Sequence, residues 1–168
     1  MTESQITQKS SSRQQKMSKL SKLAFGLGHV LNDLCGNCWF SYILIYMTKV
    51  VGLSNGQAGL ILLIGQFADG LFTPFVGYGC DRTRLKIYGK RKFWHLIGST
   101  CVTVSFPFIF NLIVTGHDGV SSSFKMAYYA AFVIIFQFGW GAGQISHLSL
   151  IPTIIKKPSE NVELNAIR

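Results

Sequence analysis

The sequence has few charged residues and lacks the motifs of common catalytic centres. Asp, Glu, Lys and Arg make up only 14% of its 168 residues, whereas an average soluble domain carries about 25%. It contains no glycine-rich phosphate-binding loop, no HExxH pattern and no GxSxG pattern. We therefore expect the chain not to be an enzyme and to need no cofactor or metal.

Features of secreted proteins are also scarce. The sequence carries four cysteines and no Asn-x-Ser/Thr acceptor for glycosylation. No apolar signal segment precedes the cysteines, because residues 1–21 are polar and basic. We therefore expect no disulfide framework, and residues 1–21 are predicted to form a disordered cytosolic tail.

Long apolar runs dominate the rest of the sequence. Four segments are each long enough to cross a hydrocarbon core of ~30 Å as a helix. Their apolar residues are continuous rather than alternating, which favours helices over strands. The expected fold is an all-α integral membrane protein with four transmembrane helices. The predicted spans are Lys22–Met47, Gln57–Gly79, Phe93–Val114 and Met126–Ile155.

The basic residues predict how these spans are oriented. Fourteen of the 16 Lys and Arg residues lie in the N-terminal tail, in the second connection or after the fourth span. The first and third connections hold only Lys49 and Lys125. This imbalance places the N-terminus in the cytosol. It also makes a lipid bilayer, rather than nucleic acid, the expected partner of a chain with a net charge of +9.

The end of the sequence predicts further helices. Residues 156–168 have the pattern of a basic loop followed by the start of another helix. We therefore expect the four spans to be part of a longer bundle, with 22–168 forming a partial domain.

Two acids lie well inside the predicted spans, where charge is costly, so both are candidates for function. In the first span, His29, Asp33 and Asn37 recur every four residues and so share one helix face. A carboxylate with a histidine one turn away suits a proton or cation relay. The alternative is a polar clamp between two helices.

The second acid, Asp69, shares a face of the second span with Thr73 and Gln66. Carboxylate and hydroxyl oxygens suit a small hard cation, and Pro74 can free a backbone carbonyl nearby. The alternative is that Asp69 pairs with a basic residue of another helix.

In the fourth span, Gln144 lies among three glycines, Gly139, Gly141 and Gly143. Small residues let helices approach closely, so we expect these glycines to serve packing first. Room for a substrate beside Gln144 is the alternative.

The connection after the second span combines one acid with a basic cluster. Gly77, Asp81, Arg82 and Arg84 follow one another at the predicted cytosolic end of that span. Charge pairs at such a position can form in one conformation and break in another. We expect a cytosolic gate here, and a generic basic loop is the alternative.

Several of these stretches, taken together, resemble a known family. They include Gly28-His29-x-Leu31-Asn32-Asp33, Gly65-Gln66-x-Ala68-Asp69-Gly70-x-x-Thr73-Pro74, Gly77-x-x-x-Asp81-Arg82-Thr83-Arg84 and Gln144-Ile145-Ser146-His147-Leu148. Over about residues 20–168, the sequence resembles the glycoside–pentoside–hexuronide:cation symporter branch of the major facilitator superfamily. It is similar also to the animal major facilitator superfamily domain-containing protein 12 group.

The resemblance implies a twelve-helix, two-bundle transporter that works by alternating access. It implies that Asp33 helps bind substrate and that Asp69 is a cation-site acid. Thr73 and Gln144 stand where the bacterial symporters carry further acids, which weakens a sodium site. The animal group is associated with cysteine import into lysosomes and melanosomes, and the bacterial branch with sugar entry coupled to sodium or protons.

We therefore expect a secondary active transporter of a small solute, with cysteine as the leading substrate and either a proton or a sodium ion as the coupling ion. A lysosomal or melanosomal membrane is expected, with the plasma membrane as the alternative. A sugar:cation symporter is the alternative function. A non-transporting four-helix scaffold, or an inactive fragment, is the alternative of another class.

Overall fold

The computed structural model describes residues 19–83, 89–112 and 119–154, and all regular structure in these ranges is helical. The predicted all-α fold is confirmed. The tail predicted at residues 1–21 lies almost entirely outside the described residues. The elements are α2 (Lys19–Ile45), the π-helical turn η1 (Tyr46–Val50), α3 (Asn55–Arg82), α4 (Lys90–Ile109) and α5 (Ser122–Ile154).

Each long helix overlaps one predicted apolar segment, but the ends differ. The first segment stops being α-helical at Ile45 and continues as a π-helical turn. Helix α3 extends past its apolar segment at both ends, because a helix can continue into the polar interface. Helix α4 ends at Ile109, and the helix-breaking Pro107 lies in its last turn.

Helix α3 begins at a capping box. The side chain of Ser54 accepts a hydrogen bond from the backbone N–H of Gln57 at 3.3 Å. The backbone N–H of Ser54 in turn donates to the side chain of Gln57 at 3.0 Å. This reciprocal pair satisfies two backbone donors that a helix N-terminus leaves without partners. It accounts for the sharp start of α3 after the turn at 51–54.

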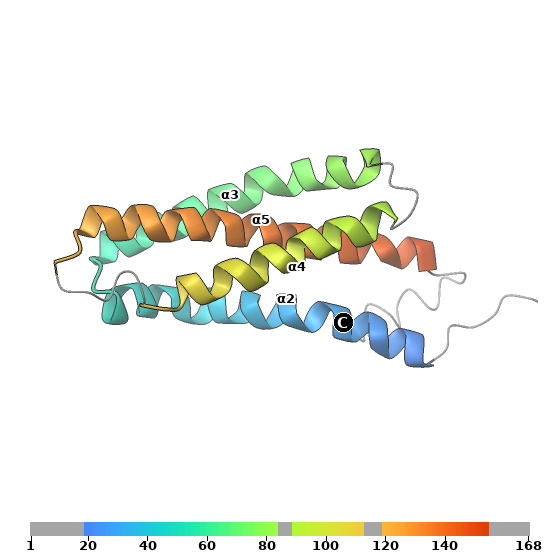
Figure 1. The fold of residues 1–168 in the computed structure, drawn as a ribbon, viewed down its shortest axis with the longest axis horizontal. Coiled ribbons are helices and arrows are strands. Elements are labelled where there is room, and N and C mark those ends of the chain that lie inside the picture. Colours follow the sequence, from blue (N-terminus) through green and yellow to red (C-terminus); the bar gives the residue numbers. More distant parts are fainter. Residues whose placement is uncertain (1–18, 84–88, 113–118, 155–168) are drawn as a thin grey trace, which may run out of the picture.

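The four long helices lie side by side and successive helices run in opposite directions, so they form an elongated bundle (Figure 1). Helix α5 is central, because its most extensive contacts are with α4 and α3. The start of α2, the end of α3, the start of α4 and the end of α5 meet at one end of the bundle. This arrangement is the one that alternating membrane crossings require.

Helices α4 and α5 touch through their backbones at a cluster of glycines. A Cβ on Gly98 would lie 2.5 Å from the backbone nitrogen of Gly143 and 2.7 Å from the carbonyl oxygen of Gly139. No side chain fits at that separation. The prediction that Gly139 and Gly143 serve helix packing is thus confirmed.

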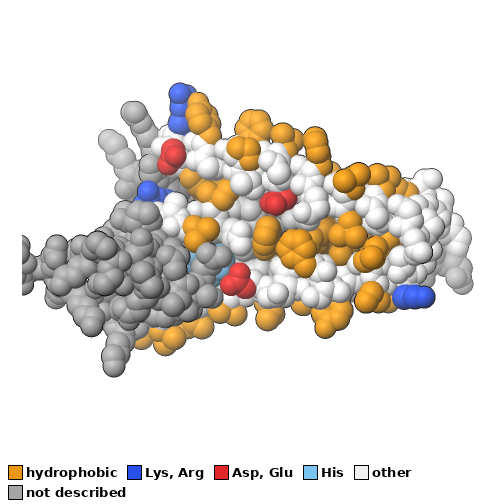
Figure 2. Space-filling view, turned by 180° about the vertical axis from the view of Figure 1, so that it is seen from behind, with side chains coloured by type: hydrophobic (Ala, Val, Ile, Leu, Met, Phe, Trp, Pro, Cys, Tyr) orange, Lys and Arg blue, Asp and Glu red, His pale blue; other side chains and the backbone are white. Residues whose placement is uncertain are grey.

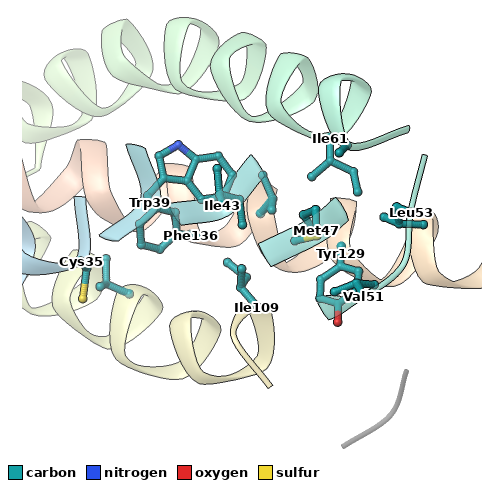
Figure 3. Packing of buried hydrophobic residues seen from close by; sticks show 13 residues of the cluster. Cys35, Trp39, Ile43, Met47, Val51, Leu53, Ile61, Ile109, Tyr129 and Phe136 are labelled. Atoms are coloured by element: carbon teal, nitrogen blue, oxygen red, sulfur yellow. The ribbon is translucent and has the colours of Figure 1, made fainter. Parts of the chain in front are cut away.

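An aromatic and aliphatic core fills the half of the bundle next to the turn after α2 (Figure 3). Trp39 and Phe136 meet at its centre, with ring centroids 5.4 Å apart. Ile43 and Met47 continue the core along α2, and each is only 1% exposed. At the same end, Lys125 donates from Nζ to the carbonyl oxygen of Val51 at 3.0 Å, which ties α5 to the turn.

The outer surface is largely apolar (Figure 2). On α3, large side chains such as Leu63, Phe67 and Phe75 are each more than 60% exposed. Such exposure is expected where lipid or further helices replace water. By length and composition alone, α3 over Asn55–Arg82 and α5 over Ser122–Leu150 are able to cross a membrane.

Helices α2 and α4 were predicted to span the membrane as well. Within the described residues, they do not combine the length, the mean hydropathy and the low number of charges that this test requires. Helix α2 carries His29, Asn32, Asp33 and Asn37, and α4 begins with three consecutive basic residues. These polar residues lower the mean hydropathy of the two helices.

Candidate functional site: a polar pocket on α2 and α5

The predicted polar face of α2 turns gradually from the bundle interior to the surface. His29 is fully buried, whereas the side chain of Asp33 is 40% exposed. Nε2 of His29 lies 3.2 Å from Oδ1 of Asp33. One turn later, Asn37 is exposed and donates from its amide to the backbone carbonyl of Asp33 at 2.9 Å. Asp33 is thus the residue that joins the buried and exposed parts of this face.

A pocket of about 190 Å³ opens beside Asp33. Its walls come from α2, through Asp33, Gly36, Asn37 and Phe40, and from α5, through Trp140. Phe40 and Trp140 meet edge to face, with ring centroids 5.9 Å apart. The pocket therefore combines a carboxylate, an amide and two aromatic rings, which suits a small solute that carries a positive charge.

Trp140 is a pocket residue that sequence analysis missed. A Cβ on Gly36 would lie 2.8 Å from Nε1 of Trp140, so the indole fits only because position 36 lacks a side chain. This buried indole N–H has no hydrogen-bond partner among the described residues. A buried donor without a partner is costly, and a bound solute that accepts its hydrogen bond would remove that cost.

The second predicted pair, Asp69 and Thr73, is brought together on α3. Oγ1 of Thr73 donates to Oδ1 of Asp69 over 3.3 Å. A Cβ on Gly141 of α5 would lie 3.4 Å from that Asp69 oxygen and 3.5 Å from the Thr73 hydroxyl. Gly141 therefore leaves space in front of these two oxygen atoms.

The two acids face different partners along α5. The pocket wall that Asp33 shares with α5 is Trp140, whereas Asp69 faces the next residue, Gly141. Asp69 is not part of the pocket lining. Gln144 lies one turn further along α5, half-buried, and makes no direct hydrogen bond to Asp33 or Asp69 in the described structure. The predicted set of substrate and ion residues thus divides into an Asp33 group and an Asp69 group.

Two more histidines, which sequence analysis did not place in the site, approach His29 from other helices. The ring of His147 on α5 stacks on that of His29, with centroids 4.7 Å apart. His95 on α4 contacts His147 as well, with ring centroids 5.6 Å apart. Helical spacing could not reveal this cluster, because each histidine comes from a different helix.

The predicted gate lies where α3 ends and α4 begins. The guanidinium of Arg82 lies 4.9 Å from the centre of the Tyr78 ring. Nε1 of Trp94 donates to Oγ1 of Thr83 at 2.9 Å, which ties the start of α4 to the end of α3. Asp81 is exposed, and a Cβ on Gly77 would meet nothing within 4 Å. Arg84 lies outside the described residues.

Other features add no further site chemistry. A larger groove of about 430 Å³ runs along α3, but it is lined by apolar residues such as Leu63, Phe67 and Ile134, as expected for contact with lipid or another helix. Among residues 19–83, 89–112 and 119–154, no group of three or more His, Cys, Asp or Glu side chains could hold a metal ion.

Comparison with known proteins identifies the class. Residues 24–168 match the family described as MFS/sugar transport protein. The chain is 48% identical to major facilitator superfamily domain-containing protein 12 of Mus musculus over 152 residues, and 48% identical to that of Homo sapiens over 154 residues. A Synechocystis protein described as an uncharacterized symporter is 26% identical over 155 residues.

A helical bundle with an apolar exterior and a few half-buried acids within its helices is typical of a membrane transport protein, and the match extends over most of the chain. The chain belongs to the MFS/sugar transport protein family, so it is an integral membrane protein and not an enzyme. The mouse and human alignments each cover 90% of this chain and 32% of the relative. The Synechocystis alignment covers 92% of this chain and 28% of the relative. The chain thus spans about a third of the length of these relatives.

Proposed function

We propose that the chain contributes the Asp33 pocket to a secondary active transporter that moves a small solute across the membrane by alternating access. The observation that carries the proposal is a pocket of about 190 Å³ lined by Asp33, Asn37 and Trp140, whose buried indole N–H lies beside Gly36 without a hydrogen-bond partner among the described residues. Drug-sized ligand sites start at about 300 Å³, so this volume fits a solute of amino-acid size.

L-cysteine is the proposed solute. Its ammonium group would pair with the Asp33 carboxylate, and its carboxylate would accept from the Trp140 indole. The similarity to the mouse and human proteins supports this choice, because the animal group they represent is associated with cysteine import into lysosomes and melanosomes. We propose a lysosomal or melanosomal location on the same ground, with the plasma membrane as the alternative.

Asp69 and Thr73 are proposed to hold the coupling ion. Their two oxygens are 3.3 Å apart and face the space left by Gly141. A proton or a sodium ion would fit such a site. The half-buried Gly77 and the exposed Asp81 and Arg82, together with Arg84, are proposed to form the cytosolic gate against helices outside this chain.

A sugar:cation symporter is the second candidate. The family description names sugar transport, and the Synechocystis relative is described as a symporter. The aromatic rings of Phe40 and Trp140 could stack on a sugar ring. Two candidates of another class, a non-transporting membrane scaffold and an inactive fragment, predict no transport at all.

Uptake into proteoliposomes separates these candidates. The longest product that carries this sequence would be reconstituted and supplied with radiolabelled L-cysteine or a radiolabelled disaccharide, at varied pH and sodium. We expect saturable cysteine uptake that Asp33→Asn and Asp69→Asn each reduce strongly. The matched control is Ser123→Ala, at an exposed position far from both acids, which should leave uptake unchanged.

Disaccharide uptake would instead establish the sugar symporter. Uptake that neither acid variant changes would show that the pocket is assigned wrongly. Absence of transport for both solutes, from protein that is folded and correctly inserted, would favour the scaffold or the inactive fragment.

A further inference from the structure

Three histidines from three helices lie in ring contact and form a stack, in which His29 and His147 are buried and His95 is half-buried. The ring of His147 is nearly parallel to that of His29, at 23°, and lies at 41° to that of His95. Phe25 covers His147 as well, with ring centroids 4.1 Å apart. His29 is 0% exposed and His147 is 3% exposed. The stack therefore links α2, α5 and α4 within the bundle.

The stack is connected to the pocket through Asp33. Nε2 of His29 lies 3.2 Å from Oδ1 of this residue, which also lines the pocket. At the other end, Nδ1 of His95 lies 3.4 Å from the carbonyl oxygen of Gly143. A proton on the stack would thus interact electrostatically with the Asp33 carboxylate.

Other charged groups lie farther from the stack than Asp33 does. Helix α4 carries Arg91 and Lys92 about one turn before His95. On α3, Asp69 lies next to Gly141 of α5. The charged residues Asp81 and Arg82 lie at the end of α3. Helix α5 carries no Asp, Glu, Lys or Arg between Lys125 and its end at Ile154. Within residues 19–83, 89–112 and 119–154, Asp33 is a carboxylate at ion-pair distance from the stack, 3.2 Å from His29.

We propose that the stack of His29, His147 and His95 binds one proton that competes with the cationic group of the solute for Asp33. The transporter would then exchange the solute for a proton instead of moving both in the same direction. This inference rests on the proposed transport of a small solute with an ammonium group through the Asp33 pocket.

One proton per stack follows from the geometry. Imidazole gains and loses a proton near neutral pH. Burial disfavours the charged form, but the Asp33 carboxylate stabilises the first proton. A second proton would place two positive rings about 5 Å apart, so like-charge repulsion favours one proton per stack.

The exchange step then needs no change in covalent bonds beyond transfer of the proton. In the proton-loaded state, the His29 imidazolium pairs with the Asp33 carboxylate. When the ammonium of the solute enters the pocket and pairs with Asp33, the imidazolium loses its counter-charge and releases its proton to water. The ammonium group of the solute then replaces the imidazolium as the counter-charge of Asp33.

The first test needs no solute. The histidine rings of the longest product that carries this sequence would be labelled with nitrogen-15 and followed by NMR in lipid nanodiscs between about pH 5 and 8. We expect the three rings to respond together, with about one proton bound per stack. The Asp33→Asn variant should bind less of that proton at any pH in this range.

The variant His147→Phe provides a matched control, because it keeps an aromatic ring against Phe25 and His29 but cannot bind a proton. In this variant His29 and His95 should titrate separately. Independent titration of all three histidines in the unmodified protein, or no effect of Asp33→Asn, would overturn the proposal.

The second test measures proton release on addition of L-cysteine in weak buffer. The unmodified protein should acidify the solution as cysteine binds, and Ser123→Ala should do the same. His29→Gln, which removes the imidazole beside Asp33, should bind cysteine with little or no proton release. Cysteine binding without proton release by the unmodified protein would refute exchange and leave the proposed transport standing. If cysteine does not bind, the proposed substrate fails, and the NMR titration alone decides whether the proton site exists.

Discussion

At the scale of single residues, the Trp140 indole is the part of the pocket that can be altered most selectively. Trp140→Phe keeps an aromatic ring between Gly36 and Phe40 but removes the buried N–H. A lost hydrogen bond of about 1 kcal/mol should weaken solute binding roughly five-fold. We expect KM for L-cysteine uptake to rise by this factor while thermal stability changes little. An unchanged KM would exclude the indole as a solute ligand.

The contact between Gly98 and the backbone of α5 predicts a large effect on stability. Gly98→Ala would place a methyl group 2.5 Å from the Gly143 nitrogen, so the two helices must separate. Overpacking of this kind typically costs about 1–3 kcal/mol. We expect a lower midpoint of thermal unfolding in detergent, followed by the fluorescence of a thiol-reactive dye.

The control for this substitution is Gly70→Ala. A Cβ on Gly70 meets nothing within 4 Å, and alanine favours a helix over glycine. Gly70→Ala should therefore leave the midpoint unchanged or raise it. If both variants behave alike, helix propensity and not close packing governs the response.

Residue spacing predicted some of the site and could not predict the rest. The face of α2 that holds Asp33 and Asn37 follows from a four-residue repeat, as does the pairing of Asp69 with Thr73. Trp140 and His95 were missed because their partners lie on other helices. The pocket role of Trp140 depends on Gly36, more than a hundred residues earlier in the sequence.

At the scale of helices, the capping box of α3 makes a separate prediction. Ser54→Ala removes the acceptor for the Gln57 N–H and should cost about 1 kcal/mol of stability. Ser54→Asp supplies another acceptor at the same position and should restore most of that loss. Hydrogen exchange of the first turn of α3 would report the change, and equal exchange rates in all three proteins would contradict the capping role.

Apolar segments located all four long helices, because continuous apolar runs of this length have few other stable structures in a bilayer. The helix ends predicted from hydropathy were less accurate than the helix positions. The π-helical turn at Tyr46–Val50 and the early end of α4 at Ile109 depend on local backbone hydrogen bonds, which hydropathy does not register.

At the scale of the whole molecule, the outer face of α3 and the open side of the Asp33 pocket need partners. Substrate sites in such transporters lie between two repeats or bundles, and this chain spans about a third of its relatives. We predict that the 168 residues alone do not transport. Saturable uptake of L-cysteine by this chain alone in liposomes would contradict that prediction.

The central claim is that the helices cross the bilayer in alternating directions, and impermeant thiol labelling tests it most directly. In a variant whose native cysteines are replaced, one new cysteine would be introduced by Ser123→Cys at the start of α5 or by Arg82→Cys at the end of α3. These positions lie at opposite ends of the bundle. In sealed vesicles of one orientation, we predict that the reagent labels one variant from outside and the other only after permeabilisation. Labelling of both variants from the same side would contradict the account.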